Sequence, residues 1–229
     1  MDERNALGPA TPQLRDIDAV VERITRRLRT RYGHVFSQET VESYVDDCAL
    51  LLRCRARLGT HLPVLIERFA DQRLGALATA SGLSPKPVPE VLFVCTENAG
   101  RSQLAAALMH RRAGGSVVVR SAGSEPGLDI SPVVRALLAD LGLDVGGEFP
   151  KPITPEVVAA ADVVITLGCG DACPVLPGRR YVNWDLPDLS GLDLETARAV
   201  RDTLDTRIAD LVRELTEARS VAGDSGIGR

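Results

Sequence analysis

The hydrophobic pattern of the chain changes near residue 85. Before that point, apolar residues recur every three or four positions, which is the spacing of amphipathic helices. The three stretches with this pattern are 13–31, 37–58 and 62–80, and Ser37 is suited to cap the second of them. Because the joints between the stretches are short, we expect an antiparallel three-helix bundle in a domain that spans residues 1–82.

A proline-rich stretch, 83–89, follows the third helical pattern and is expected to be an extended linker. Beyond it, over residues 90–229, short apolar runs alternate with helical patterns. The expected strands are 91–94, 116–123, 162–167 and 180–184, and the expected helices are 103–110, 131–142 and 192–218. This alternation predicts an α/β domain with a four-stranded parallel open sheet flanked by helices.

Residues that could carry chemistry follow the ends of three expected strands. Cys95, Gly168 and Asp185 each come just past such an end. In an open parallel sheet, ligands bind at the carboxyl ends of the strands. We therefore expect these segments to meet at one edge of the sheet and to form the reactive site there.

The stretch from Cys95 to Ser102 has the features of an anion-binding loop. It joins an apolar strand to a helix, so successive backbone N–H groups can form a concavity to which the helix N-terminus adds positive charge. The spacing lets Arg101 hold an oxyanion from the side while the Cys95 thiolate lies beneath it. The residues expected to bind the anion are Thr96, Glu97, Asn98, Ala99, Gly100, Arg101 and Ser102.

The same N–H groups should stabilise the thiolate form of Cys95 and make it a nucleophile. The alternative is a buried cysteine at a strand end that lies near an unrelated surface arginine. The strand before the loop, the small residues within it and the helix after it favour the anion-binding interpretation.

Two further cysteines, Cys169 and Cys173, lie in a glycine-bearing loop after the third expected strand. Zinc would require four ligands at characteristic spacings, and no histidine is near in the sequence, so no metal is expected. A purely structural pair remains an alternative. The redox interpretation is favoured because Cys95 should open onto the same edge of the sheet.

Composition narrows the class of protein. The 229 residues are 45% hydrophobic and carry a net charge of −4, which gives no case for nucleic acid as a partner. Arginines near the ends of the first two helices are expected from the helix dipole alone. No apolar run approaches the roughly 20 residues that a bilayer requires, and the N-terminus lacks the pattern of a signal peptide. Five cysteines without a dense disulfide framework favour a reducing cytoplasm.

The motif Cys95-x5-Arg101-Ser102, with Asn98 inside it, resembles the phosphate loop of the low-molecular-weight protein tyrosine phosphatase superfamily. The amino-acid sequence of residues 94–103 is most similar to that of the superfamily's arsenate reductases. This resemblance covers about 90–218, and the N-terminal helices resemble extra helical segments of some actinobacterial members.

The resemblance implies roles for several residues. Asn98 would fix the shape of the loop, and Ser102 would donate to the Cys95 sulfur. Asp188 would protonate the departing oxygen, with Asp185 as the alternative acid. Residues 186–191 contain no aromatic side chain that could sandwich a phosphotyrosine ring, and Leu189 stands where these reductases commonly have proline.

The resemblance also implies an enzyme that converts arsenate to arsenite without a bound cofactor. Cys95 would attack arsenate, and a second thiol would then resolve Cys95. Cys169 and Cys173 could relay the resulting disulfide to thioredoxin, although their spacing is shorter than in the relay enzymes of the family. A related branch instead uses mycothiol and a mycoredoxin-type redoxin. The other hypotheses are a tyrosine phosphatase or phosphomonoesterase, and a non-enzymatic arsenite sensor that uses the three cysteines.

Overall fold

The computed structural model describes residues 12–53, 62–143, 145, 147–168 and 175–224. The chain divides into two compact units, Met1–Gly75 and Ala76–Arg229, so the boundary lies within a helix. The domain limits expected from the sequence, 1–82, 83–89 and 90–229, refer to independently folding parts, which this division does not test. They stay a prediction.

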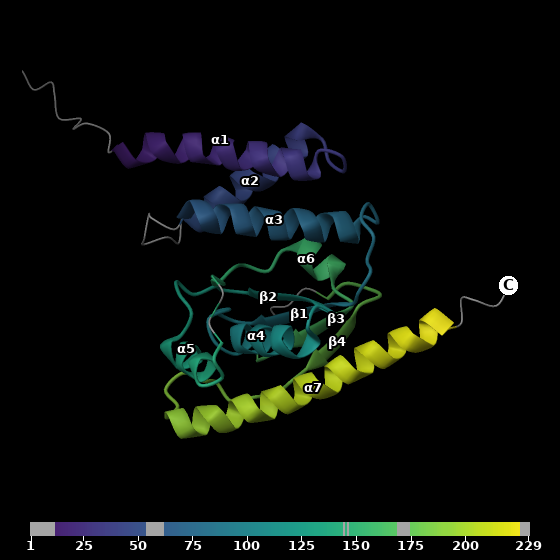
Figure 1. Ribbon diagram of the computed structural model, residues 1–229. Helices are drawn as coiled ribbons and strands as arrows, with labels where there is room; N and C mark the ends of the chain where they lie inside the picture. Colours follow the sequence, from purple (N-terminus) through teal and green to yellow (C-terminus); the bar gives the residue numbers. More distant parts are fainter. Residues whose placement is uncertain (1–11, 54–61, 144, 146, 169–174, 225–229) are drawn as a thin grey trace, which may run out of the picture. The chain divides into compact units, whose positions relative to one another are not determined.

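The first unit contains α1 (Pro12–Tyr32), α2 (Gln38–Arg53) and most of α3 (Leu62–Ala80), as Figure 1 shows. The Thr40 N–H donates to Ser37 Oγ at 3.3 Å, so Ser37 caps α2 as expected. The expected end of the second helix, near residue 58, lies outside the described residues. The helices α1 and α2 pack against each other.

Charged side chains connect α3 to the other two helices. Arg31 of α1 pairs with Asp71 at 3.0 Å, and the Tyr32 hydroxyl donates to the same carboxylate. The guanidinium of Arg73 is buried, pairs with Asp47 of α2 at 2.5 Å and lies 4.9 Å from the centroid of the Tyr44 ring. Arg27, Arg31 and Arg53, near the ends of the first two helices, thus take part in contacts between helices.

The second unit is built on one sheet, formed by β1 (Glu90–Cys95), β2 (Val118–Gly123), β3 (Val163–Thr166) and β4 (Arg180–Asn183). All neighbouring strands are parallel and their order is β2-β1-β3-β4. The strand that carries Cys95 is therefore central. This confirms the predicted four-stranded parallel open sheet, which is flanked by helices and preceded by a helical unit.

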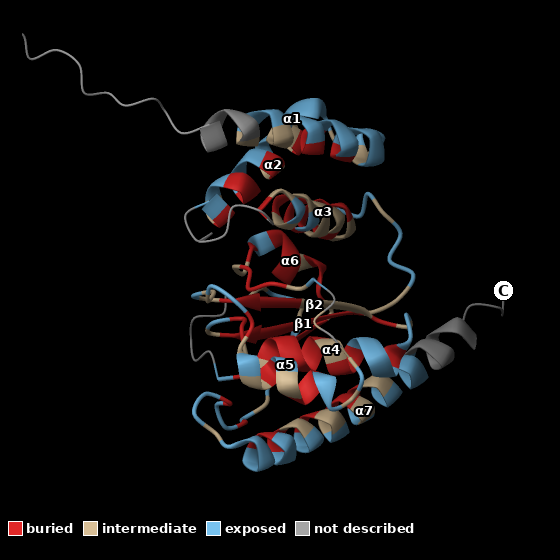
Figure 2. Ribbon diagram, turned by 60° about the vertical axis from the view of Figure 1, so that its left-hand side comes forward, coloured by how far each residue is buried: buried red, intermediate tan, exposed pale blue. Residues whose placement is uncertain are grey.

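Helices cover both faces of this sheet. Figures 1 and 2 show α4 (Arg101–Ala113), α5 (Pro132–Ala139) and α7 (Leu194–Asp224) on one face and α6 (Pro155–Ala160) on the other. Along β1, Phe93 and Cys95 belong to the core under α4 and α7, whereas Leu92 and Val94 belong to the core on the α6 side. This alternation places the sulfur of Cys95 on the same side as the helix that follows its loop.

The helix α6 is not among the elements expected from the sequence. It has six residues and begins at Pro155, which is well placed at a first helical position because its φ is fixed and it lacks an N–H. A helix of six residues is too short to show a hydrophobic periodicity in the sequence. Its buried residues, among them Val157 and Val158, nevertheless complete the second core.

The helices α4 and α7 are joined by ionic hydrogen bonds. Arg112 donates to both carboxylate oxygens of Asp205, with its Nε at 2.6 Å from Oδ1, and Arg111 approaches the same group at 3.4 Å. The Asp205 side chain is 19% exposed. Because α4 begins at the end of the expected anion loop, this pair stabilises the helix that follows the loop.

Replacing Asp205 by asparagine should destabilise the protein at neutral pH. Hydrogen bonds from Arg112 hold the pKa of the Asp205 carboxyl below its usual value, against the opposing effect of burial. A carboxyl with a lowered folded-state pKa stabilises the fold above its unfolded pKa, and this contribution is lost as the pH falls through the folded pKa. We expect a loss of about 1 kcal/mol at pH 7. The loss should shrink as the pH falls below the unfolded pKa of about 3.9 and should vanish below the lower folded pKa.

Thermal unfolding at several pH values measures this difference. Asp210→Asn is the control, because Asp210 pairs with Arg213 of the same helix and both side chains are more than half exposed. It should change the free energy of unfolding by less than about 0.5 kcal/mol. An Asp205→Asn effect that stays constant down to low pH would contradict the assignment.

Candidate active site

The backbone of the loop after β1 is held in place through its carbonyl groups. The carbonyls of Cys95, Thr96, Glu97 and Ala99 accept hydrogen bonds from the backbone N–H groups of Ser124, Glu125, Gly127 and Ser131 at 2.7–3.2 Å. In a trans peptide the N–H points opposite to the C=O of the same unit. The N–H groups of residues 96, 97, 98 and 100 therefore point away from segment 124–131, toward the interior of the loop. This is the orientation that an anion-binding concavity requires.

The glycine at the end of β2 allows this close approach. A Cβ atom at Gly123 would lie 2.5 Å from the Thr96 carbonyl oxygen and 2.8 Å from the Asn98 nitrogen. Both are backbone atoms that cannot move without changing the loop. Nothing in the sequence distinguishes Gly123 from other glycines, because its importance comes from this contact with the loop.

Asn98 has a backbone conformation that is unusual for a residue with a side chain. Its φ is +48°, and among the described residues it is the non-glycine residue with positive φ. Its N–H donates to the Cys95 sulfur at 3.2 Å. Asparagine tolerates this region better than most residues, so its choice here is consistent with the role that the sequence suggested for it.

Polar groups surround the sulfur of Cys95. Ser102 Oγ lies 2.9 Å from it, and Asn98 Nδ2 donates to Ser102 Oγ at 2.9 Å. The residues Cys95, Asn98 and Ser102 are all at least 97% buried. Two of the predicted loop residues, Asn98 and Ser102, thus contact the thiol directly.

A second layer lies behind Asn98. Its Oδ1 accepts from Gln103 Nε2 at 3.1 Å and from the Lys151 backbone N–H at 3.0 Å. Gln103 Nε2 also donates to the Phe149 carbonyl at 3.1 Å. The sequence analysis assigned no role to Gln103 or Lys151, because nothing in the motif itself points to residues 149–151.

Arg101 and Asp188 also meet. Arg101 Nη2 lies 3.2 Å from Asp188 Oδ2, and Nη1 donates to the Leu186 carbonyl at 2.9 Å. The guanidinium passes over Gly168, where a Cβ atom would lie 2.6 Å from Nη1. The alternative acid, Asp185, contributes its backbone carbonyl to Arg207 at 3.4 Å. The contact with Arg101 favours Asp188, which remains a prediction as the acid.

Cys169 and Cys173 lie outside the described residues, so their predicted roles cannot be compared with this geometry. Within the described part of the chain, Cys48 and Cys95 are buried thiols outside any disulfide. No group of three or more potential metal ligands occurs in that part. No helix there is both long and apolar enough to cross a membrane.

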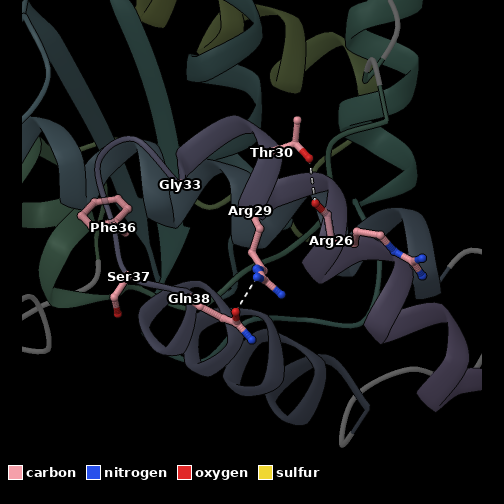
Figure 3. Close-up of a pocket in the computed structure, with 7 residues that line it drawn as sticks. All are labelled: Arg26, Arg29, Thr30, Gly33, Phe36, Ser37 and Gln38. Atoms are coloured by element: carbon pink, nitrogen blue, oxygen red, sulfur yellow. Dashed lines mark hydrogen bonds between the residues drawn. The ribbon is translucent and has the colours of Figure 1, made fainter.

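A separate hollow of about 520 Å³ lies in the first unit, between α1 and the start of α2. Figure 3 shows Arg26, Arg29 and Gln38 among its lining residues, and the guanidinium of Arg29 donates to the Gln38 side chain. Arg29 also pairs with Glu42 at 3.8 Å. Arg29 thus serves contacts between α1 and α2. None of the predicted catalytic residues that the structure describes lines the hollow.

Known proteins share both parts of the chain. The family model described as low molecular weight phosphotyrosine protein phosphatase matches residues 90–221. The chain belongs to this family. The model described as protein-tyrosine-phosphatase-like, N-terminal domain, matches residues 21–78. The resemblance stated from the sequence is therefore confirmed for both parts.

Several of the similar proteins are arsenate reductases. The thioredoxin-dependent arsenate reductase of Corynebacterium glutamicum has a similar structure, with a TM-score of 0.79 and 43% identity over 87% of this chain and 98% of its own. An arsenate reductase in the phosphate binding state matches 56% of this chain and 99% of its own, with a TM-score of 0.51 and 30% identity. The glutaredoxin arsenate reductase of Synechocystis is 32% identical over 130 residues, covering 56% of this chain and 98% of its own.

Gly123→Ala should weaken oxyanion binding at the family's anion loop. The added Cβ would displace the Thr96 carbonyl or the Asn98 nitrogen, so the N–H groups would no longer converge. We expect at least a tenfold loss of affinity for inorganic phosphate, which corresponds to about 1.4 kcal/mol. Calorimetric titration with phosphate measures it.

Gly127→Ala is the matched control. Gly127 lies in the same supporting segment, but a Cβ there would be 3.4 Å from its nearest neighbour, the Ala99 Cβ. It should bind phosphate within about twofold of wild type. Equal losses in both variants would show that the segment as a whole, and not the close contact at Gly123, controls binding.

Proposed function

We propose that this protein is an arsenate reductase that uses Cys95 as its nucleophile. The observation that carries the proposal is the anion loop, in which outward carbonyls aim the N–H groups inward and Asn98 and Ser102 contact the Cys95 sulfur. The similarity to an arsenate reductase of known structure over 87% of the chain supports the same substrate.

In the first step the Cys95 thiolate attacks the arsenic of arsenate. An S–As bond forms, and an arsenic-bound oxygen departs as water once it has received a proton. The loop N–H groups and Arg101 stabilise the negative charge on the remaining oxygens. Asp188, which lies 3.2 Å from Arg101, supplies the proton to the departing oxygen.

In the second step another thiol attacks the Cys95 sulfur. A disulfide forms, the S–As bond breaks, and its electron pair stays with arsenic, which leaves as arsenite. Arsenic is reduced from As(V) to As(III), and two thiols are oxidised to one disulfide. We propose Cys169 or Cys173 as the resolving thiol, because both follow β3, the strand next to the one that ends at Cys95.

An external thiol must then reduce the disulfide. Thioredoxin is the favoured reductant because the similar C. glutamicum enzyme is thioredoxin-dependent. Mycothiol with a mycoredoxin-type redoxin is the second possibility. Either would act in a reducing cytoplasm, which is the compartment we propose.

Phosphatase activity is not favoured as the main function. The loop could hold a phosphate ester, and weak turnover of small esters is compatible with the proposal. However, aromatic residues make up only 3% of the chain and none occurs in 186–191, so a phosphotyrosine ring has little to pack against there. A sensor without turnover would need neither the acid nor the anion loop.

Cys95→Ser should abolish arsenate-dependent oxidation of the reductant. A hydroxyl is a much weaker nucleophile than a thiolate, so we expect a loss of at least about a thousandfold in kcat/KM. Cys48→Ala is the control, because Cys48 is buried in the helical unit and should leave turnover unchanged. Turnover of phosphotyrosine peptide that exceeds that of arsenate would overturn the proposed substrate.

In the same assay, Asp188→Asn should lower kcat by about a hundredfold, as loss of a general acid typically does. Asp185→Asn, three residues away, is its matched control and should be nearly neutral. The reverse result would move the acid to Asp185.

Replacing Cys169 and Cys173 by serine, one at a time, tests the source of the electrons. If the relay operates, each variant should lose thioredoxin-coupled turnover, by at least about a hundredfold, because the disulfide passed to thioredoxin cannot form. Turnover of both variants should also be measured with mycothiol and a redoxin in place of thioredoxin. Full thioredoxin-coupled turnover in both variants would exclude the internal relay and leave the external thiol.

A further inference from the structure

Gln103 lies in the first turn of α4, directly after Ser102, and is 3% exposed. Its Nε2 atom donates both to Asn98 Oδ1 and to the Phe149 carbonyl, each at 3.1 Å. The buried amide thus bridges the anion loop and the segment before α6. Because both N–H groups of this buried amide donate hydrogen bonds, a side chain of the same size without these donors could not replace it.

Two backbone groups of segment 149–151 determine which way the amides point. The Phe149 carbonyl can only accept, so the atom of Gln103 that faces it must be the nitrogen. The Lys151 N–H can only donate, so the atom of Asn98 that faces it must be the oxygen. Gln103 Nε2 and Asn98 Oδ1 then also match each other as donor and acceptor.

This orientation fixes the direction of the contacts that reach the sulfur. With its Oδ1 turned toward Gln103 and Lys151, Asn98 presents Nδ2 to Ser102 Oγ at 2.9 Å. The serine oxygen accepts this N–H, so its own proton is available for the Cys95 sulfur at 2.9 Å. A hydroxyl that donates to sulfur stabilises the thiolate, whereas one that accepts from it would stabilise the thiol.

We propose that Gln103 is a positioning residue for the reaction at Cys95, acting through Asn98 and Ser102. Together with the Lys151 N–H, its Nε2 group holds the Asn98 amide in the orientation that makes Ser102 a donor to the sulfur. The inference rests on the proposed role of Cys95 as nucleophile, but it concerns the reactivity of the thiol and not the identity of the substrate.

The test measures the rate at which iodoacetamide alkylates Cys95 in the full-length protein, followed by mass spectrometry of the Cys95 peptide between pH 5 and 9. Arsenate is absent, so the result is independent of whether the protein reduces it. Gln103→Met keeps the length of the side chain and removes both N–H donors. We expect alkylation at pH 6 to be about fivefold slower than in wild type, the effect of one lost hydrogen bond.

A double-mutant cycle separates positioning from general stability. If Gln103 acts through Ser102, then Ser102→Ala with Gln103→Met should react no more slowly than Ser102→Ala alone. Two independent effects would instead multiply. Leu108→Met is the matched control, because it places a methionine in the same helix at a fully buried site remote from the loop. Its alkylation rate should equal that of wild type.

Thermal unfolding of each variant is recorded so that rates are compared well below its melting temperature. Should Gln103→Met not fold, Gln103→Glu keeps the shape while leaving at most one donor for two acceptors, and it should be slowed similarly. A folded Gln103 variant with the wild-type rate and pH profile, or effects that multiply in the cycle, would overturn the proposal.

Discussion

The active site depends on where the carbonyl groups of one loop point. Four carbonyls of residues 95–99 are bound by backbone N–H groups of segment 124–131, which turns the opposite N–H groups inward. Backbone-to-backbone contacts of this kind need no particular side chain. The exception is a place where two backbone segments come very close, as at Gly123. The loop is therefore built by the end of β2 and the segment after it as much as by its own residues. The oxyanion binding that we propose for the loop depends on this arrangement.

The sequence predicted the parts that a local pattern can carry. The strand before Cys95 and the loop from Cys95 to Ser102 followed from an apolar run that leads into small residues and a helix. The parallel sheet followed from the alternation of short apolar runs with helical patterns. The sequence did not predict the strand order, the short helix α6 or the residues that hydrogen-bond to the Asn98 side chain. Gln103 and the backbone of residues 149–151 are 46 positions apart or more, and no periodicity or spacing relates them. Such contacts exist only once the sheet has formed.

Arg101 connects two parts of the site that are far apart in the sequence. Its guanidinium follows the loop directly, yet it donates to the Leu186 carbonyl and to the Asp188 carboxylate after β4. Two of its five N–H groups serve these contacts among the described residues, and the others remain available for an oxyanion. One largely buried guanidinium therefore links the loop that we propose binds the anion to the carboxylate that we propose as the acid. In this proposal a change in either loop would affect the other.

In the reaction proposed above, the burial of Cys95 constrains the route by which electrons can arrive. Only 3% of the residue is accessible, and the Ser102 hydroxyl and the Asn98 N–H lie against its sulfur at 2.9 and 3.2 Å. The disulfide-exchange surface of a protein such as a redoxin is far too large to reach that sulfur, since exchange requires a direct in-line approach of one sulfur to another. A carrier must travel between the two: either a low-molecular-weight thiol that enters the loop, or a cysteine of the chain that visits Cys95 and then meets the protein partner elsewhere.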